Sequence, residues 1–317
     1  MNTIMQSVRR SAIVTLILTN SILGTSVSAA AAPVEHSQLF KPWINGVSAR
    51  EPQMQVQRYD NDTYVIRQSI RTNFEGPFLY VLFGSDRALL IDTGAGGLNV
   101  RPTIDRVIDE WAARHHRMSI PLVVAHSHSH GDHHQGDAEF QDRPHTIVVG
   151  LYPKDVADFF KITDWPNQIV SYDLGGRVLD IIPTPGHQSA HIMVFDRKTR
   201  LMFSGDSLGP YRLYVSMNEA KTYRDSIDRV AAFTRDKQVS WILGAHIEMT
   251  TKPGELIPDE APSHPDEHVL EISYSNLPEL QTALHAMGDT LVQDVHHDFV
   301  IFPVPAREQQ PFAPPAK

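Results

Sequence analysis

One short stretch of the chain holds a high density of side chains that can bind metal ions. Residues 126–137 contain five histidines and two aspartates. Imidazole nitrogens and carboxylate oxygens suit Zn²⁺ and similar ions, and ligands at alternate positions of a loop can converge on one ion. The apolar residues 120–124 precede the stretch and predict a short buried strand that positions it. A compositional histidine tract is the simpler alternative, but such tracts are usually repetitive, and this stretch occurs once.

Within this stretch one register stands out, His128-x-His130-x-Asp132-His133. Moving the register two residues back, to begin at His126, would place His130 where the aspartate is needed. Three more candidate ligands, each at the end of a predicted strand, follow along the chain: His187 after a Pro-Gly turn, Asp206 after an apolar run, and His246.

The pattern resembles the signature of the metallo-β-lactamase-fold hydrolases, and the resemblance covers about residues 60–250. It implies an α+β fold built as a four-layer αββα sandwich. It also implies a cofactor of two Zn²⁺ ions, with Fe or Mn as alternatives, that share a bridging hydroxide as the nucleophile. The implied ligands are His128, His130 and His187 for the first ion, Asp132, His133 and His246 for the second, and Asp206 for both.

The resemblance assigns further roles to residues around these ligands. Asp132 would orient the hydroxide and then take its proton, which makes it the implied catalytic residue. His191 and Asp92 match positions that hold ligands in place, although an aspartate after a strand can equally cap a turn. Residues just after the implied bridging aspartate are candidate substrate contacts: Tyr211, Arg212 and Tyr214.

The residue at position 206 distinguishes the β-lactamases of this superfamily from its other hydrolases. In the β-lactamases proper the corresponding position is Cys or Ser, whereas this chain has Asp206. The sequence therefore favours the glyoxalase II/lactonase-like branch and hydrolysis of an ester, thioester or lactone. Residues 251–317 are too few for the helical domain of glutathione thioesterases. The alternatives are a phosphodiesterase or β-lactamase of the same fold, or a di-iron or metal-binding protein without hydrolase activity.

Periodicity predicts the elements that must hold these side chains. Alternating or continuous apolar runs predict strands at 63–66, 78–83, 88–91, 146–149, 176–182, 201–203, 239–246 and 298–302. Helices are expected at 102–116, at 154–161, from a capping box at Thr222 and Asp225 to about Arg235, and at 277–287 before Gly288. Aromatic residues at 159, 160 and 165 fit a core better than a pocket, and the histidines at 264, 268, 296 and 297 are expected at the surface.

Composition limits the possible partners. The formal charge of the 317-residue chain is −9, which disfavours nucleic acid and leaves a small-molecule substrate as the expected partner. There is no cysteine, so thiolate ligands, disulfides and lipoprotein anchors are excluded. The oligomeric state is left open.

The N-terminus predicts export. Residues 1–32 combine a basic Arg9-Arg10 pair, an apolar segment from Ala12 to Leu23 and small residues at a cleavage site, which together indicate a signal peptide. The apolar segment is shorter than the ~20 residues of a membrane-spanning helix. We therefore expect a periplasmic or secreted protein without a membrane anchor after cleavage, in which residues 33–317 form one domain with a C-terminal extension.

Overall fold

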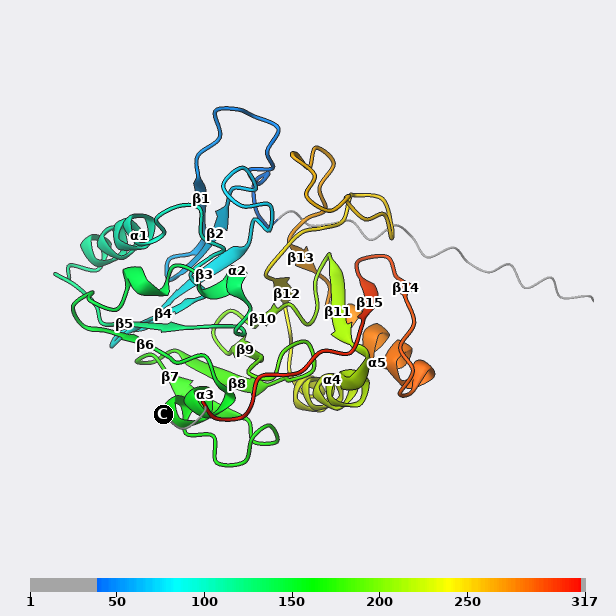
Figure 1. Cartoon of the computed structure of the whole chain (residues 1–317). Helices are drawn as coiled ribbons and strands as arrows, with labels where there is room; N and C mark the ends of the chain where they lie inside the picture. The colour runs from blue at the N-terminus through cyan, green and yellow to red at the C-terminus, as the bar shows by residue number, and fades with distance from the viewer. Residues whose placement is uncertain (1–38, 315–317) are drawn as a thin grey trace, which may run out of the picture. The chain divides into compact units, whose positions relative to one another are not determined.

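Two six-stranded sheets form the centre of the computed structural model, which describes residues 39–314 (Figure 1). The first sheet contains, in spatial order, β1 (Met54–Asp60), β2 (Thr63–Gln68), β3 (Phe78–Phe83), β4 (Ala88–Ile91), β5 (Leu122–Ala125) and β6 (Thr146–Val148). The second contains β13 (Glu271–Ile272), β12 (Trp241–Gly244), β10 (Leu201–Gly205), β9 (Ile192–Asp196), β8 (Val178–Pro183) and β7 (Val170–Asp173). The predicted signal peptide lies outside the described residues and stays a prediction.

Strand β3 shows why these apolar runs form a sandwich. Successive side chains of a strand point to opposite faces of the sheet. Accordingly, Phe78, Tyr80 and Leu82 face the core between the two sheets, whereas Leu79 and Val81 belong to a second hydrophobic cluster on the other face. Both faces are buried, so the strand is a continuous apolar run in the sequence.

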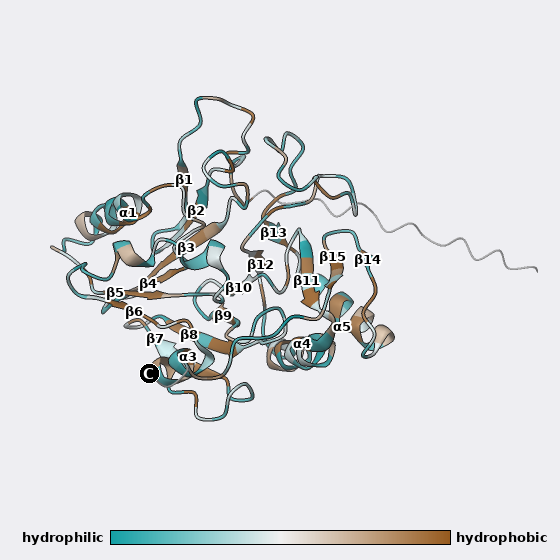
Figure 2. Ribbon diagram, viewed as in Figure 1, coloured by the Kyte–Doolittle hydropathy of each residue, from teal (hydrophilic) through white to brown (hydrophobic). Residues whose placement is uncertain are grey.

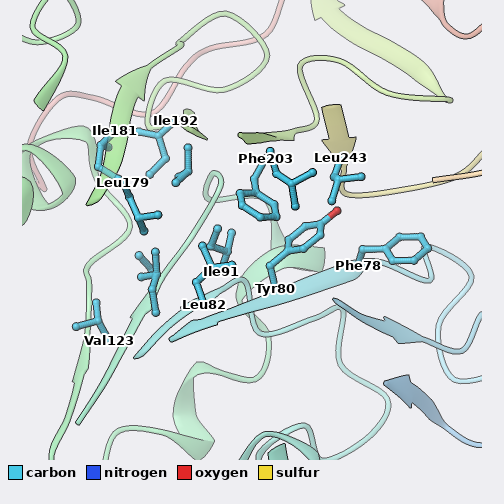
Figure 3. Close-up of a cluster of buried hydrophobic side chains, with 14 of the residues drawn as sticks. Phe78, Tyr80, Leu82, Ile91, Val123, Leu179, Ile181, Ile192, Phe203 and Leu243 are labelled. Atoms are coloured by element: carbon cyan, nitrogen blue, oxygen red, sulfur yellow. The ribbon is translucent and has the colours of Figure 1, made fainter. Parts of the chain in front are cut away.

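The second sheet supplies the opposite half of the inner core. Leu179 and Ile181 of β8 and Phe203 of β10 join the same cluster as Tyr80, and the Tyr80 and Phe203 ring centroids are 4.6 Å apart (Figure 3). Figure 2 shows the hydrophobic residues concentrated in the strands of both sheets, while most connecting loops are hydrophilic.

Helices cover the two outer faces. On the first sheet, α1 (Arg101–Arg114) buries Ile104, Val107, Ile108, Trp111 and Ala112. On the second, α4 (Ala220–Thr234) and α5 (Asn276–Met287) bury residues such as Ile227 and Leu280. The layers therefore run helix, sheet, sheet, helix, and the predicted αββα sandwich is confirmed. Two short helices lie in connections, α2 (Gly131–His134) and α3 (Pro153–Phe160).

Parallel pairing places the ends of several strands at one edge. β4 pairs in parallel with β5 across the α1 crossover, and β10 pairs in parallel with β12 across α4. The carboxyl ends of parallel strands lie at the same edge of a sheet. At this edge the backbone N–H of Phe78 donates to the Ala245 carbonyl over 2.8 Å, which ties the first sheet to the loop after β12.

One helix start was predicted wrongly. The helix α4 begins at Ala220, with Glu219 as its N-cap, so Thr222 lies inside the first turn and does not cap the helix. Asp225 instead pairs with Lys221, one turn earlier, over 2.6 Å. The predicted helix 277–287 is confirmed as α5, which Gly288 terminates with a left-handed φ of 65°.

The segment after residue 250 builds more of the fold than a surface extension would. β13 is an edge strand of the second sheet, and a third sheet joins β11 (Arg212–Ser216), β15 (Val300–Val304) and β14 (Asp294–Val295). Strand β15 runs parallel to β11, with Tyr214 opposite Phe302. Among the described residues, no helix is both long and apolar enough to cross a membrane.

Candidate metal centre

All seven predicted ligands lie in the connections that follow strands of the two central sheets. The connection after β5 carries four of them, with His128 and His130 in a loop and Asp132 and His133 in the short helix α2. His187 follows β8, Asp206 follows β10 and His246 follows β12. Since these strands end at one edge of the sandwich, residues more than a hundred positions apart in the sequence meet there. The structure brings them together as two adjacent groups of potential ligand atoms.

The first group consists of three imidazoles, those of His128, His130 and His187. Nδ1 of His130 lies 3.0 Å from Nε2 of His128 and 2.9 Å from Nε2 of His187. Ring nitrogens this close together can bind the same metal ion through their lone pairs. Three imidazoles are a known ligand set for Zn²⁺. The chemistry of this donor set fits a metal ion.

The second group contains two carboxylates and two imidazoles. Oδ2 of Asp132 lies 2.9 Å from Nε2 of His133 and 3.3 Å from Nε2 of His246, and the two Nε2 atoms are 3.4 Å apart. Asp206 completes the group. A mixed set of imidazole and carboxylate ligands again suits Zn²⁺ or a similar ion.

Asp206 lies between the two groups. Its Oδ2 is 3.7 Å from Nε2 of His128 and 3.5 Å from Nε2 of both His187 and His133. Its Oδ1 is 3.5 Å from Nε2 of His246 and is a buried oxygen with no hydrogen-bond partner among the described residues. A buried carboxylate oxygen without a donor is costly, and a metal ion would satisfy it. The residues present therefore fit a pair of metal ions.

The outer nitrogens of the ligand histidines are held by acceptors. Nδ1 of His187 lies 2.7 Å from the Tyr214 carbonyl, and Nδ1 of His246 lies 2.9 Å from the Glu75 carbonyl. A carbonyl can only accept, so Nδ1 carries the proton in both rings, and Nε2 of the neutral ring keeps its lone pair toward the centre. This arrangement fixes the tautomer and ring orientation that a metal ligand requires.

Asp92 supports the loop that carries four of the ligands. Its carboxylate accepts hydrogen bonds from the Ser127 N–H at 2.7 Å and the Ser127 hydroxyl at 2.8 Å, and Oδ2 lies 3.0 Å from Nδ1 of His133. The residue is buried and has a left-handed φ of 67°. Through these contacts Asp92 holds the segment that carries four of the predicted ligands.

His191 holds the backbone beside Asp206. Its Nδ1 lies 2.7 Å from the Thr184 hydroxyl, and its Nε2 accepts a hydrogen bond from the Asp206 N–H at 3.2 Å. The ring is fully buried, which keeps its pKa well below the ordinary value of 6.5, and the neighbouring His187 adds to this effect. A neutral ring is the form that accepts from the Asp206 backbone.

Burial and like neighbours disfavour protons in the first group. Burial holds the pKa of His128 well below 6.5, and the neighbouring imidazoles lower it further. Burial is also the main cause that lowers the pKa of His130 to about 4. Both rings are therefore neutral at neutral pH, which is the form that binds metal.

In the second group, carboxylates raise the pKa of a histidine above its ordinary value despite burial. Burial lowers the pKa of His246, but the charges of Asp206 and Asp132 outweigh burial and raise it to about 10. Burial likewise raises the pKa of both carboxyl groups, and the adjacent imidazoles outweigh it and hold both below their ordinary range. Without a metal ion this group attracts protons to the positions that a cation would take.

Two histidines of the same stretch lie outside both groups. Nε2 of His126 lies 2.8 Å from Oδ1 of Asp137, which also accepts from the Thr93 hydroxyl at 2.8 Å. The His134 ring is near His126, with 6.2 Å between their centroids. The register that begins at His128 is thus the one whose side chains converge.

A cavity of about 410 Å³ opens onto the two groups. Among the ligands that line it are His130, Asp132 and Asp206. All three predicted substrate contacts also line it, yet the Tyr211 hydroxyl donates to the Gly205 carbonyl over 2.5 Å, and Arg212 pairs with Glu248 and Asp259. The Tyr214 hydroxyl has no partner among the described residues, and Tyr214 therefore remains the most available of the three.

Sequence reasoning missed part of this cavity. The loop between β2 and β3 contributes Phe74 and Glu75, and the segment after residue 250 contributes, among others, Ile257, His264 and Arg307. The prediction that His264 and His268 lie at the surface was wrong, because their exposed fractions are 7% and 5%. The nearby residues Val269, Leu270 and Ile272 are apolar, but Glu271 interrupts them, so the sequence gives only a weak signal that this segment is buried. The aromatic residues at 159, 160 and 165 pack against the core, as predicted.

Residues 73–240, more than half of the chain, match the family model described as the metallo-beta-lactamase superfamily. The chain belongs to this superfamily. The resemblance seen in the ligand pattern is thereby confirmed at the level of the family.

Two relatives are hydroxyacylglutathione hydrolases. The protein of Rhizobium meliloti (strain 1021) is 29% identical over 138 residues, which cover 40% of this chain and 52% of the relative. The protein of Xanthomonas euvesicatoria pv. vesicatoria (strain 85-10) is 29% identical over 165 residues, which cover 50% of this chain and 57% of the relative. The chain thus matches slightly more than half the length of each relative.

Solved structures of the superfamily are similar as well. A metallo-beta-lactamase from Pontibacter korlensis has a TM-score of 0.48 and 16% identity, over 74% of this chain and 99% of that chain. An archaeal metallo-beta-lactamase superfamily protein from Sulfolobus tokodaii has a TM-score of 0.42 and 17% identity, over 69% and 84%.

Proposed function

We propose that this protein is a zinc-dependent hydrolase that cleaves an ester, thioester or lactone. The observation that carries the proposal is the position of Asp206, which lies within 3.7 Å of ligand nitrogens from both groups and keeps a buried oxygen free of hydrogen bonds. A carboxylate in this position would hold two metal ions close together. Such a pair, when bound, supplies an activated water nucleophile and stabilises negative charge that develops on the substrate.

Two side chains of the cavity would act on the water and on the substrate. Asp132 lines the cavity beside His133 and His246, so its carboxylate would orient the attacking water and take a proton from it. The Tyr214 hydroxyl would donate a hydrogen bond to the substrate from the cavity wall. Burial raises the pKa of Tyr214 above its ordinary value, so this hydroxyl stays protonated and able to donate.

Two observations support an acyl substrate. The two relatives that match at 29% identity are named hydroxyacylglutathione hydrolase. In addition, position 206 is an aspartate, whereas the β-lactamases proper have Cys or Ser there. Both favour an ester, thioester or lactone over a β-lactam ring.

A substrate panel on protein loaded with zinc tests the proposal. We expect two equivalents of zinc per chain by elemental analysis, and turnover of an ester, a thioester or a lactone. Turnover of only a phosphodiester or a β-lactam would overturn the substrate class. A metal content that stays near one equivalent after dialysis against zinc would overturn the two-metal centre.

A further inference from the structure

A chain of buried polar side chains ends at the cavity wall. Arg67 on β2, 1% exposed, forms a two-pronged ion pair with Glu267, in which Nη2 and Oε1 are 2.5 Å apart. The same Oε1 lies 3.2 Å from Nδ1 of His264. A buried ion pair adds little net stability, because desolvation offsets the attraction between the charges. Its clearest effect here is to hold the His264 ring in one place.

The backbone of His264 is held as tightly as its ring. Its N–H donates to the Asn45 carbonyl over 2.7 Å, and the Asn45 side-chain amide donates to the His264 carbonyl over 3.0 Å. A carboxylate oxygen accepts, so Nδ1 is the nitrogen that donates to Glu267, and in an imidazole with its proton on Nδ1 the other nitrogen, Nε2, is an acceptor. Nε2 has no partner within residues 39–314, and His264 is a cavity-lining residue that is 93% buried. This nitrogen is therefore the free acceptor of a fixed side chain that lines the cavity.

The other polar side chains of the cavity wall point to the same preference. Glu75, Glu248, Asp259 and Glu260 all offer acceptors. Of the two arginines that line the cavity, Arg212 already pairs with Glu248 at 3.2 Å and Asp259 at 3.0 Å, and it donates to the Ile257 carbonyl over 2.9 Å.

Arg307 is the exception. It lines the cavity, is exposed, and its guanidinium has no partner among the described residues. An exposed guanidinium attracts an anion only weakly, because solvent screens it. Apart from the Tyr214 hydroxyl and the exposed Arg307, the free polar groups of the cavity wall are therefore mainly acceptors, and a substrate group that binds against segment 257–264 should bring a donor.

We infer that the segment 257–264 forms a subsite for a hydrogen-bond-donating group of the substrate, with Nε2 of His264 as the acceptor. The inference rests on the proposed function and narrows it: the acyl substrate carries a hydroxyl or amide N–H away from the scissile bond, and not a carboxylate. A bound substrate would exclude water from this nitrogen, and an acceptor that loses water without gaining a donor is unfavourable, so a substrate that lacks the donor binds less well.

A matched series of para-nitrophenyl esters tests this inference on the zinc-loaded enzyme. The series comprises hexanoate, its β-hydroxy and ε-hydroxy analogues, and the adipate monoester, which have the same chain length and differ in the donor or charge. We expect the wild type to favour at least one hydroxy ester over hexanoate by about 5- to 10-fold in kcat/KM, mainly through KM. The adipate monoester should be the poorest substrate.

Three variants of His264 separate its two ring nitrogens. His264→Phe removes both and should abolish the preference, so that kcat/KM for the hydroxy ester falls relative to kcat/KM for hexanoate. His264→Asn keeps a donor for Glu267 but no acceptor at the Nε2 position, and should behave like the phenylalanine variant. His264→Gln places an amide near the Nε2 position and should recover part of the preference. His285→Phe, at an exposed histidine that pairs with Asp228, is the matched control.

The outcomes distinguish the two proposals. Equal zinc content in all variants together with an unchanged preference in both His264→Phe and His264→Asn would overturn the subsite, and so would a wild type that favours the adipate monoester. Failure of the zinc-loaded wild type to hydrolyse any ester, thioester or lactone would overturn the proposed function, and the subsite with it.

Discussion

The two ligand groups lie side by side and have opposite electrostatic character. The first, His128, His130 and His187, has no charged member of its own, and burial keeps its rings neutral. The second contains Asp132 and Asp206, whose charges raise the pKa of His246 to about 10 despite burial. The difference shows that adding carboxylates to a buried cluster of imidazoles reverses the effect of burial on the imidazole pKa values. A metal ion must displace protons in the second group but not in the first.

The largest effect is expected where the two groups meet. Asp206→Ala would remove the carboxylate that contacts both groups, and the two ions would lose their shared ligand. We expect kcat/KM to fall on the order of 10²-fold or more, as for other preorganised electrostatic groups, together with a zinc content below two equivalents. Kinetics and elemental analysis on the same preparation test this. A variant that keeps two equivalents and full activity would show that Asp206 does not join the groups.

Asp92 offers a way to disturb the second group without touching a metal ion. Asp92→Ala removes the acceptor of Nδ1 of His133 and both hydrogen bonds from Ser127. Loss of such an outer partner typically weakens metal affinity by about 10- to 100-fold. Competition with a chelator should show one ion released earlier than in the wild type. The matched control is Asp137→Ala, which affects His126 outside both groups; equal losses in the two variants would contradict the role of Asp92.

In protein freed of metal ions with a chelator, the two ligand groups should affect the stability of the fold in opposite pH ranges. The pKa of His130 falls from 6.5 to about 4 on folding, so the unfolded state binds more protons and stability is lost as the pH falls from 6.5 to 4. The pKa of His246 rises from 6.5 to about 10, so its contribution is complete below 6.5 and is lost as the pH rises to 10. Each of these two histidines alone would change the free energy of unfolding by at most about 1.4 kcal/mol per pH unit.

Urea unfolding of alanine variants over this pH range is the measurement. His130→Ala should flatten the curve on the acid side, and His246→Ala should flatten it on the alkaline side. If His246→Ala loses stability at alkaline pH as the wild type does, the carboxylates of the second group do not raise the pKa of His246.

The smallest effect is expected from histidines outside the two groups. His126→Ala removes the partner of Asp137 and no potential ligand, so we expect kcat/KM to change by no more than about threefold, with stability lower by about 1 kcal/mol. His134→Ala should cost even less activity. His128→Ala, two residues further along in the first group, is the contrast. Equal losses in His126→Ala and His128→Ala would mean that the register of the ligands begins elsewhere.

Much of the sandwich could be predicted from local pattern. The strands 78–83 and 88–91 have the predicted bounds, and the helix predicted at 102–116 is α1, because strong apolar periodicity lies within each segment itself. The spacing of His128 to His133 is equally local. Strands with weaker patterns, such as β7 and the two-residue β13, were not predicted, since β13 is stabilised by pairing with β12 and by no pattern of its own.

The sequence by itself determined the order of the candidate ligands, the family and the inner core of the sandwich, since these depend on residue types at short spacing. Only the tertiary structure decided which groups hold the ligands and shape the cavity. The Glu75 carbonyl that orients His246 is 171 residues away from it, and Glu267 is 200 residues from Arg67. A backbone carbonyl is present at every position, so no side-chain pattern marks the one that will face a histidine. Such contacts arise from the way the sheets pack, and the sequence around them carries no separate signal.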